Sequence, residues 1–234
     1  AEDHTSIPFD GISGYESDGY TTRYNKSGVR TFSRSALAEK LDISGFGELR
    51  WYYPLPDYKF PMAVFSDEYL PNITDIHSIK FGYPTESYLV ANEKKIYEEV
   101  INNKVFPFFA NSFLIECSSK ELPQERILYA SFKRDYKEKY RVATLINDAK
   151  QVIKKPVLLQ AISHLDEIEK YTKELSAKGI RILLQKRVGD NLLQQWQEIP
   201  RADTLFKKYL SENNLTKISN FIGILQNDLL KTSG

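Results

Sequence analysis

The chain has 234 residues, of which 41% are hydrophobic and 27% are charged, and its formal net charge is +1. This balance excludes an intrinsically disordered chain, and the length allows one large domain or two small ones. The single cysteine, Cys117, excludes an internal disulfide, and no apolar run approaches the roughly 18 residues that a membrane-spanning helix needs.

The first residues, Ala1-Glu2-Asp3-His4, lack the basic and hydrophobic stretches of a secretory signal peptide. A signal that has already been removed would leave no trace. A lone cysteine is also more typical of a reducing compartment than of a secreted protein. The sequence therefore predicts a cytoplasmic protein with no membrane partner.

Charge is unevenly distributed along the chain. Residues 1–117 carry 11 Lys or Arg and 17 Asp or Glu, a net charge of −6, whereas residues 118–234 carry 21 and 14, a net charge of +7. An asymmetry of this kind is typical of chains whose basic part meets a polyanion.

The first third of the chain is rich in turn-forming and aromatic residues. Residues 1–30 combine Gly, Ser, Asp and Tyr, which predicts short strands or loops joined by tight turns. Residues 33–43 predict a helix, because Ser33 or Ser35 can cap it and apolar residues lie on one side. Residues 50–65 hold three prolines and many aromatics, which favours edge strands or an ordered loop.

The middle of the chain alternates helical and strand-like segments. Residues 92–104 have apolar residues at helical spacing, whereas 112–118 and 126–132 are short apolar runs rich in strand formers. A Leu-Pro turn between the two runs predicts that they form an antiparallel pair. The stretch 140–155 fits a strand or a helix equally well.

A βαβ unit is predicted over residues 156–187. Residues 156–162 are expected to form a buried strand, Ser163 matches a capping box that opens a helix, and 180–185 return as a strand. Helices are predicted after it over residues 190–198, 202–212 and 215–230. The apolar stripe of the last helix predicts packing on the sheet, with a helix of another subunit as the alternative.

These elements predict an α+β fold. An acidic, Tyr-rich and strand-rich part, residues 1–110, leads into a basic α/β part, residues 111–234, that ends in helices. No flexible linker marks the boundary, so one continuous domain fits the sequence equally well.

Residues 120–155 interleave ten Lys or Arg with aromatic rings, against five Asp or Glu. Nucleic-acid surfaces combine cations for the phosphates with flat rings for the bases. The alternative is a solvated surface of alternating charge. The predicted phosphate contacts are Lys133, Arg134, Lys137, Lys139 and Arg141, and the predicted base contacts are Tyr136 and Tyr140.

A second candidate is the strand end that carries Glu116 and, four residues later, Lys120. Metal-dependent nucleases place an acid that holds Mg²⁺ and a lysine that steadies the phosphate at such a position. The pattern resembles the PD-(D/E)xK arrangement, although three residues rather than one separate acid and lysine, and Ser118 stands where the lysine is expected. The resemblance implies Mg²⁺ bound by Glu116. The alternative is a polar strand end without a catalytic role.

A third pattern resembles the first helix and turn of a helix-turn-helix. The resemblance lies in Ala38, Leu41, Ile43 and Ser44. Asp42 occupies the usual glycine position, and a recognition helix would have to begin within residues 45–53, which start with Gly-Phe-Gly. The alternative is a capped amphipathic helix.

The crevice of the predicted βαβ unit is a fourth candidate, because open α/β sheets bind ligands beyond the C-terminal ends of their strands. No glycine-rich phosphate loop follows a strand, so nucleotide binding is not supported. The alternative is a capped helix beside a sheet. The crevice residues are Gln160, Ser163, His164, Asp166, Lys186, Arg187 and Asp190.

The sequence leaves two functions open. The preferred one is a nucleic-acid-acting protein, whose enzymatic form would be a Mg²⁺-dependent nuclease of the defence or mobile-element type. The alternative is a non-catalytic protein that binds a protein partner through an aromatic surface. The anchors of that surface would be Trp51, Tyr52, Tyr53 and Tyr58.

Overall fold

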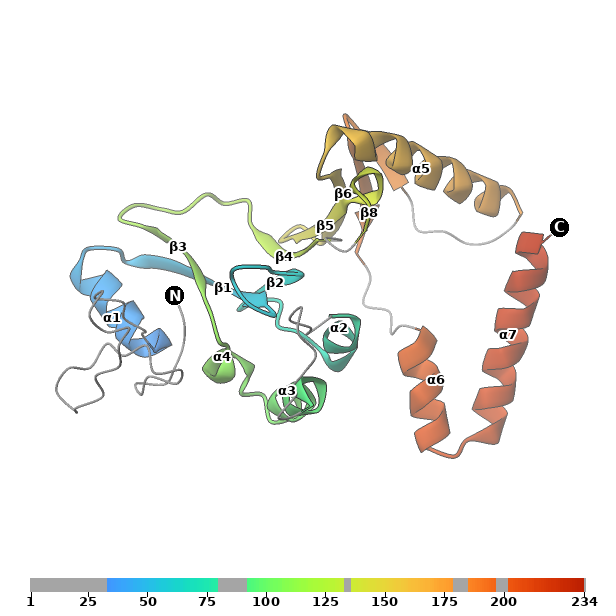
Figure 1. Cartoon of the computed structure of the whole chain (residues 1–234), viewed down its shortest axis with the longest axis horizontal. Coiled ribbons are helices and arrows are strands. Elements are labelled where there is room, and N and C mark those ends of the chain that lie inside the picture. The colour runs from blue at the N-terminus through green and yellow to red at the C-terminus, as the bar shows by residue number, and fades with distance from the viewer. Residues whose placement is uncertain (1–32, 80–91, 133–135, 179–184, 197–201, 234) are drawn as a thin grey trace. The chain divides into compact units, whose positions relative to one another are not determined.

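A computed structural model describes residues 33–79, 92–132, 136–178, 185–196 and 202–233 (Figure 1). The chain divides into two compact units, unit 1 (Ala1–Ser131) and unit 2 (Phe132–Gly234). Both units combine helices with antiparallel strands, which confirms the predicted α+β class. The predictions for residues 1–30 and 180–184 lie outside the described residues.

The two helices predicted in the first half of the chain are confirmed in unit 1. The helix over 33–43 is α1, and the helix over 92–104 is α3. The Ser33 hydroxyl caps α1, accepting a hydrogen bond from the Ala36 N–H at 3.2 Å. The elements are α1 (Arg34–Ile43), β1 (Glu48–Leu55), β2 (Ala63–Ser66), α2 (Ile73–Ser78), α3 (Glu93–Asn102), α4 (Phe106–Phe109), β3 (Leu114–Ser118) and β4 (Ile127–Phe132).

The strands of unit 1 are all antiparallel and lie in the order β3-β1-β2-β4. The predicted pairing of the runs at 112–118 and 126–132 is therefore wrong. β3 pairs with β1, and β4 pairs with β2. The aromatic segment of β1 and β2 fills the centre of the sheet because it offers larger apolar side chains than the two later runs offer each other.

The core of unit 1 is mainly aromatic. Alternate residues of β1, Trp51 and Tyr53, point to the same side and meet Phe113 edge to face at ring-centroid distances of 5.2 and 5.9 Å. Phe106 from α4 meets Tyr53 in the same way at 5.6 Å. Phe65 of β2 is fully buried beside them. One face of the β1–β2 pair thus supplies the hydrophobic core.

Unit 2 is built around a shorter set of antiparallel strands in the order β5-β6-β8-β7. The ambiguous stretch 140–155 is a hairpin of β5 and β6, turned by Lys150 at a positive φ of 58°. The elements are η3 (Glu138–Tyr140), β5 (Val142–Asn147), β6 (Gln151–Pro156), η4 (Leu159–Ala161), α5 (Ile162–Ala177), β7 (Gln185–Val188), β8 (Asn191–Gln195), α6 (Ala202–Ser211) and α7 (Leu215–Ser233).

The predicted βαβ unit differs from the structure in its first strand. Residues 156–162 are not a buried strand, because Pro156 ends β6 and Leu159 is 82% exposed in the short helix η4. The capping box at Ser163 is also wrong. Ala161 holds the N-cap position of α5, and the Ser163 hydroxyl donates to the Gln160 carbonyl at 3.3 Å.

The strands on either side of α5 are parallel but not adjacent. β6 and β7 each pair antiparallel with β8, which lies between them. The helix predicted over 190–198 is therefore wrong, since β8 occupies 191–195. A Gly189-Asp190 turn, with Gly189 at a φ of 55°, reverses the chain directly from β7 into β8. α5 packs on β6 and β8 and buries Leu165 against Leu192 (Figure 1).

The C-terminal helices are confirmed as α6 and α7, which pack on each other. Phe206 stacks on Phe221 at 5.7 Å, and Tyr209 meets the same ring at 6.2 Å. The apolar stripe of α7 was predicted to pack on the sheet, but the contacts within the described residues run to α6 instead. The hairpin engages the stripe only in part, because Phe221 packs on α6 whereas Leu215, Ile222 and Leu225 stay exposed.

Candidate nucleic-acid interface

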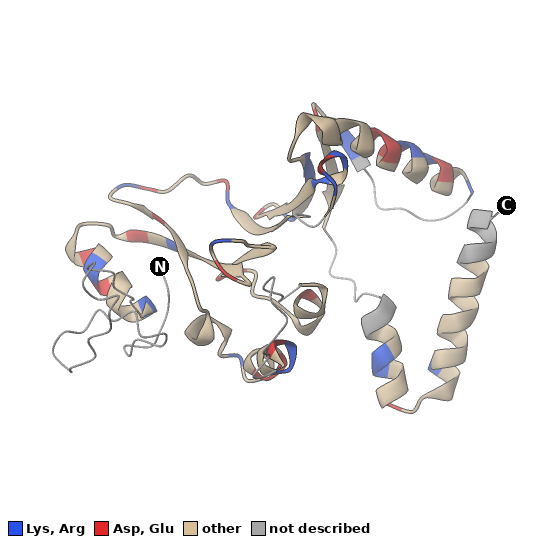
Figure 2. Cartoon of the chain, viewed as in Figure 1, with Lys and Arg blue, Asp and Glu red and all other residues tan. Residues whose placement is uncertain are grey.

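The boundary between the two units coincides with the change in charge. The sequence of unit 1 carries a formal charge of −6 and that of unit 2 a charge of +7. Within unit 2, however, α5 alternates blue and red in Figure 2. On this helix the Lys173 ammonium lies 2.8 Å from the Glu169 carboxylate. The positive surface of unit 2 therefore does not extend over α5.

Cations gather instead on the turn that leads into β5, residues 136–141, which we call the basic turn. Lys137, Lys139 and Arg141 lie on it with a single carboxylate, Glu138. The Tyr136 ring is 51% exposed beside them. Lys137 makes no ion pair within the described residues. The basic turn thus presents an excess of positive charge next to an accessible ring.

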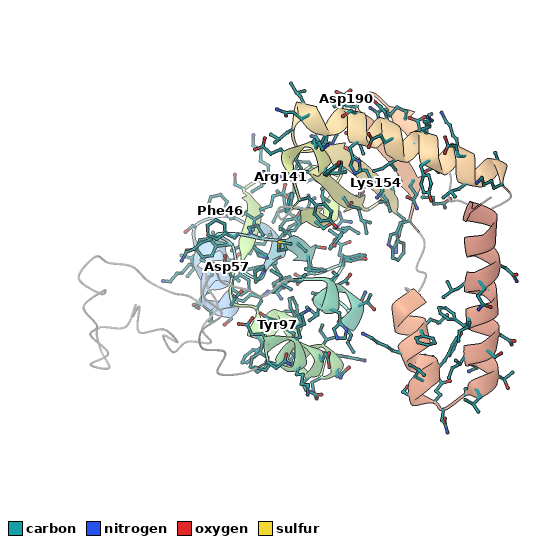
Figure 3. All side chains as sticks on the ribbon, turned by 45° about the vertical axis from the view of Figure 1, so that its right-hand side comes forward. Phe46, Asp57, Tyr97, Arg141, Lys154 and Asp190 are labelled. Carbon is teal, nitrogen blue, oxygen red and sulfur yellow. The ribbon has the colours of Figure 1, made fainter. Side chains whose placement is uncertain are left out.

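Internal hydrogen bonds fix the shape of the basic turn. The Arg141 Nε donates to the Tyr136 carbonyl at 2.9 Å, and its Nη1 lies 4.0 Å from Glu138 Oε1. Figure 3 shows Arg141 at the start of β5, in the same unit as Lys154 of β6. The groups of the basic turn lie close together because they are near in sequence and the turn is closed by hydrogen bonds to its own backbone. Their arrangement does not require a bound ligand.

The second ring of the basic turn is engaged in packing. Tyr140 meets His164 of α5 edge to face at 4.9 Å, and the Lys139 Nζ lies 4.7 Å from the centre of the Tyr140 ring. A hydrogen bond to the Tyr140 hydroxyl raises the pKa of Lys139 above its usual value, which keeps the ammonium protonated. Tyr136 is therefore the more exposed of the two rings of the basic turn.

The structure brings five of the predicted contacts together, namely Tyr136, Lys137, Lys139, Tyr140 and Arg141. Lys133 and Arg134 lie outside the described residues. The crevice residues are partly paired with each other, since Arg187 Nη2 lies 3.2 Å from Asp166 Oδ1.

Glu116 occupies a different environment from the one that a magnesium site requires. Its Oε2 accepts hydrogen bonds from Arg50 Nη1 at 3.3 Å and from the Tyr52 hydroxyl at 3.2 Å. Partial burial and the neighbouring Glu116 carboxylate raise the pKa of Tyr52, so the phenol stays a donor. The Lys120 N–H is bonded to the Ser118 hydroxyl at 3.0 Å.

The metal prediction therefore finds no support in the local chemistry. Two donors already use Glu116, and the described residues contain no group of three His, Cys, Asp or Glu side chains that could hold a metal ion. Magnesium binds oxygen ligands, and Arg50 and Tyr52 both use the Oε2 atom of Glu116. Within the part of the chain that the structure describes, Glu116 belongs to no such group, and magnesium binding by Glu116 stays a prediction.

Two other predicted surfaces are corrected by the fold. The helix-turn-helix resemblance is wrong because β1 begins at Glu48, within the segment that would have to be the recognition helix. Trp51, at 6% exposure, and the fully buried Tyr53 belong to the core, so they cannot anchor a protein partner. Tyr58 alone of the four aromatic anchors is substantially exposed.

The structure also shows two cavities in unit 1 that sequence reasoning missed. One, of about 490 Å³, is bounded by Arg34, Trp51 and Phe108. The other, of about 240 Å³, lies along β1 and includes Ser66 and Arg126. Neither set of residues has a motif spacing, because the cavities arise from how distant strands meet.

Comparison with protein-family models, with curated proteins and with solved structures found no match to this chain. Among the described residues, no helix has the length and apolar content that crossing a membrane requires. The functional argument therefore depends on the geometry of the sites alone.

Proposed function

We propose that unit 2 binds the phosphate backbone of nucleic acid, and that the basic turn is the contact surface. The observation that carries the proposal is the exposed cluster of Lys137, Lys139 and Arg141 around one carboxylate, with the Tyr136 ring beside it. Each cation can neutralise one phosphate and release its condensed counterion, while an exposed ring can stack on an unpaired base.

The small number of contacts sets the expected strength. About three phosphate contacts support only non-specific binding, with dissociation constants on the order of 10⁻⁴ to 10⁻⁶ M at physiological salt. Stacking on Tyr136 would add about 1–3 kcal/mol for a single strand, because the bases of a duplex are already stacked. The proposal therefore favours single-stranded over double-stranded nucleic acid.

Fluorescence anisotropy with a labelled oligo(dT) strand and a labelled duplex tests the proposal on the full chain. Raising the salt from about 50 to about 200 mM should weaken binding about 20- to 40-fold, the change that three phosphate contacts predict. Binding that ignores salt would contradict the proposal.

A pair of charge-reversal variants locates the surface. Lys137→Glu with Lys139→Glu should lower the affinity at least tenfold, because two phosphate contacts become repulsive. Lys170→Glu with Lys173→Glu makes the same change in charge on α5, where both lysines face carboxylates. An equal loss in this control would show that only the total charge matters and would contradict the basic turn as the site.

The nuclease prediction is separable from binding. Incubation of the labelled strand with the chain and Mg²⁺ should leave it intact if the function is binding alone. Cleavage that disappears in Glu116→Gln but persists in Lys137→Glu would instead support the enzymatic form.

A further inference from the structure

Strand β2 is shorter than the two strands that flank it. β1 spans Glu48–Leu55, but β2 pairs only with its second half, residues 52–55. On the other side, β2 pairs with β4 only over residues 129–131. After Ser66 the chain leaves the sheet in a turn closed by a bridge to Tyr69. Among the residues that the structure describes, the first half of β1 therefore has no strand neighbour on the side of β2.

The 240 Å³ cavity occupies the place of the missing strand segment. Its lining consists of three runs, 48–52 of β1, 66–68 at the end of β2, and 126–128 at the start of β4. Neighbouring strands lie about 4.8 Å apart, so β1 and β4 are separated by about 10 Å there, which is the width of one inserted strand. Residues 48–51 offer an edge about 13 Å long.

The backbone of β1 points hydrogen-bonding groups into this cavity. The Leu55 carbonyl accepts a hydrogen bond from the Met62 N–H at 2.7 Å, so odd-numbered residues of β1 direct their N–H and C=O groups toward β2. By alternation Leu49 and Trp51 direct theirs to the same side, where β2 does not reach. Pro54, which has no N–H, is even-numbered, as this alternation requires.

A buried side chain in the same cavity also lacks a partner. Ser66 is only 6% exposed, and its hydroxyl makes no hydrogen bond within the described residues although it lines the cavity. Buried hydroxyl groups are normally bonded, so this one marks a place for a polar ligand atom. It lies opposite Tyr52, at the inner end of the gap.

We infer that the cavity binds an extended peptide of about four residues, which enters between β1 and β4 as a strand antiparallel to β1. Strand addition satisfies the N–H and C=O groups of Leu49 and Trp51, and the peptide end can bond the Ser66 hydroxyl. Arg50 and Glu48 lie on one face of β1. The register therefore calls most strongly for a basic residue opposite Glu48, and an acidic residue two positions earlier, opposite Arg50, would share that guanidinium with Glu116.

The probe is the fluorescein-labelled peptide Val-Glu-Val-Lys, whose binding to the full chain is followed by anisotropy. It should bind saturably, and Val-Lys-Val-Glu should bind about tenfold more weakly, because two favourable cross-strand pairs become like-charge pairs. The same peptide methylated on the backbone nitrogens that face β1 should not bind. Equal binding of the methylated peptide, or no binding of the first, would overturn the inference.

Protein variants separate this site from general charge effects. Glu48→Lys should reverse the preference, so that Val-Glu-Val-Glu binds better than Val-Glu-Val-Lys. Glu39→Lys, on the exposed side of α1, makes the same change in charge away from the cavity and should leave the preference unchanged. Competition by free lysine or glutamate at the same site would show that the cavity takes a small polar molecule instead, which overturns strand addition.

Discussion

Unit 1 and unit 2 both combine helices with antiparallel strands, but their buried cores differ in size and composition. Unit 1 buries a continuous cluster around Trp51, Tyr53 and Phe65, whereas the core of unit 2 is a small group around Leu165 and Leu192 under one helix. Unit 2 instead carries the excess of positive charge. The larger buried cluster and the excess of cations therefore lie in different units.

Core truncation gives the largest expected effect. Phe65→Ala should lower the free energy of unfolding of unit 1 by about 3–5 kcal/mol, and Leu165→Ala that of unit 2 by about 2–3 kcal/mol. Each unit holds one tryptophan, Trp51 or Trp196, so urea unfolding followed in a Trp196→Phe or Trp51→Phe background reports one unit at a time. Equal shifts of both signals in Phe65→Ala would show that the two units do not unfold independently, which contradicts the prediction.

Removal of the Arg34 side chain should lower the unfolding free energy of unit 1 less than removal of the Phe65 ring. Arg34 donates to the Tyr53 hydroxyl at 2.8 Å and to Asp67 at 2.7 Å, and its guanidinium lies 5.0 Å from the Trp51 ring centre. Arg34→Ala should destabilise unit 1 by about 2 kcal/mol. Arg34→Lys keeps the charge but loses the fork, so its urea midpoint should fall between those of the parent and Arg34→Ala.

Loss of the N-cap of α1 should have a smaller effect on the stability of unit 1 than loss of Arg34. Ser33→Ala removes the acceptor for the Ala36 N–H and should cost about 1 kcal/mol in the unfolding free energy of unit 1. Ser35→Ala, two residues further on, keeps the capping acceptor and removes only a hydroxyl that lies 3.1 Å from the Ser33 hydroxyl, so it should cost less. A larger loss in Ser35→Ala would show that the cap is misassigned.

The smallest effect is expected at alkaline pH. Partial burial and Glu116 raise the pKa of Tyr52, so the folded state retains a proton that the unfolded chain loses above about pH 10. The unfolding free energy of unit 1 should therefore fall as the pH rises past that value. Urea midpoints at about pH 9 and pH 11 should differ less in Tyr52→Phe than in the parent, whereas Tyr58→Phe should keep the full difference.

Local signals in the sequence predicted local structure well. Ser33 before an apolar side predicted α1, and apolar spacing in 92–104 predicted α3, because capping and periodicity act over a few residues. The cluster of Tyr136 with Lys137 and Arg141 was predictable for the same reason, since one turn of chain holds all of them.

Features that depend on distant partners were not predictable. Nothing near Ile115 indicates that it pairs with Trp51 rather than with the next apolar run, because strand order is decided by packing across the whole sheet. The prediction of a helix at β8 was wrong because the five residues of β8 do not alternate apolar with polar residues. Pairing with β6 and β7, which are distant or follow no local signal, makes this segment a strand. The cavity at Ser66 follows from the lengths of three strands, which no single segment records.

Strand β7 stands at the outer end of the strand order in unit 2 and carries Lys186 and Arg187. A strand in that position leaves a row of backbone groups that a second chain could match, which is how fibrils begin. The exposed Lys186 repels its counterpart in an identical strand brought alongside and makes dehydration of that edge costly, whereas Arg187 pairs with Asp166. The positive charge at this edge thus opposes self-association of the chain.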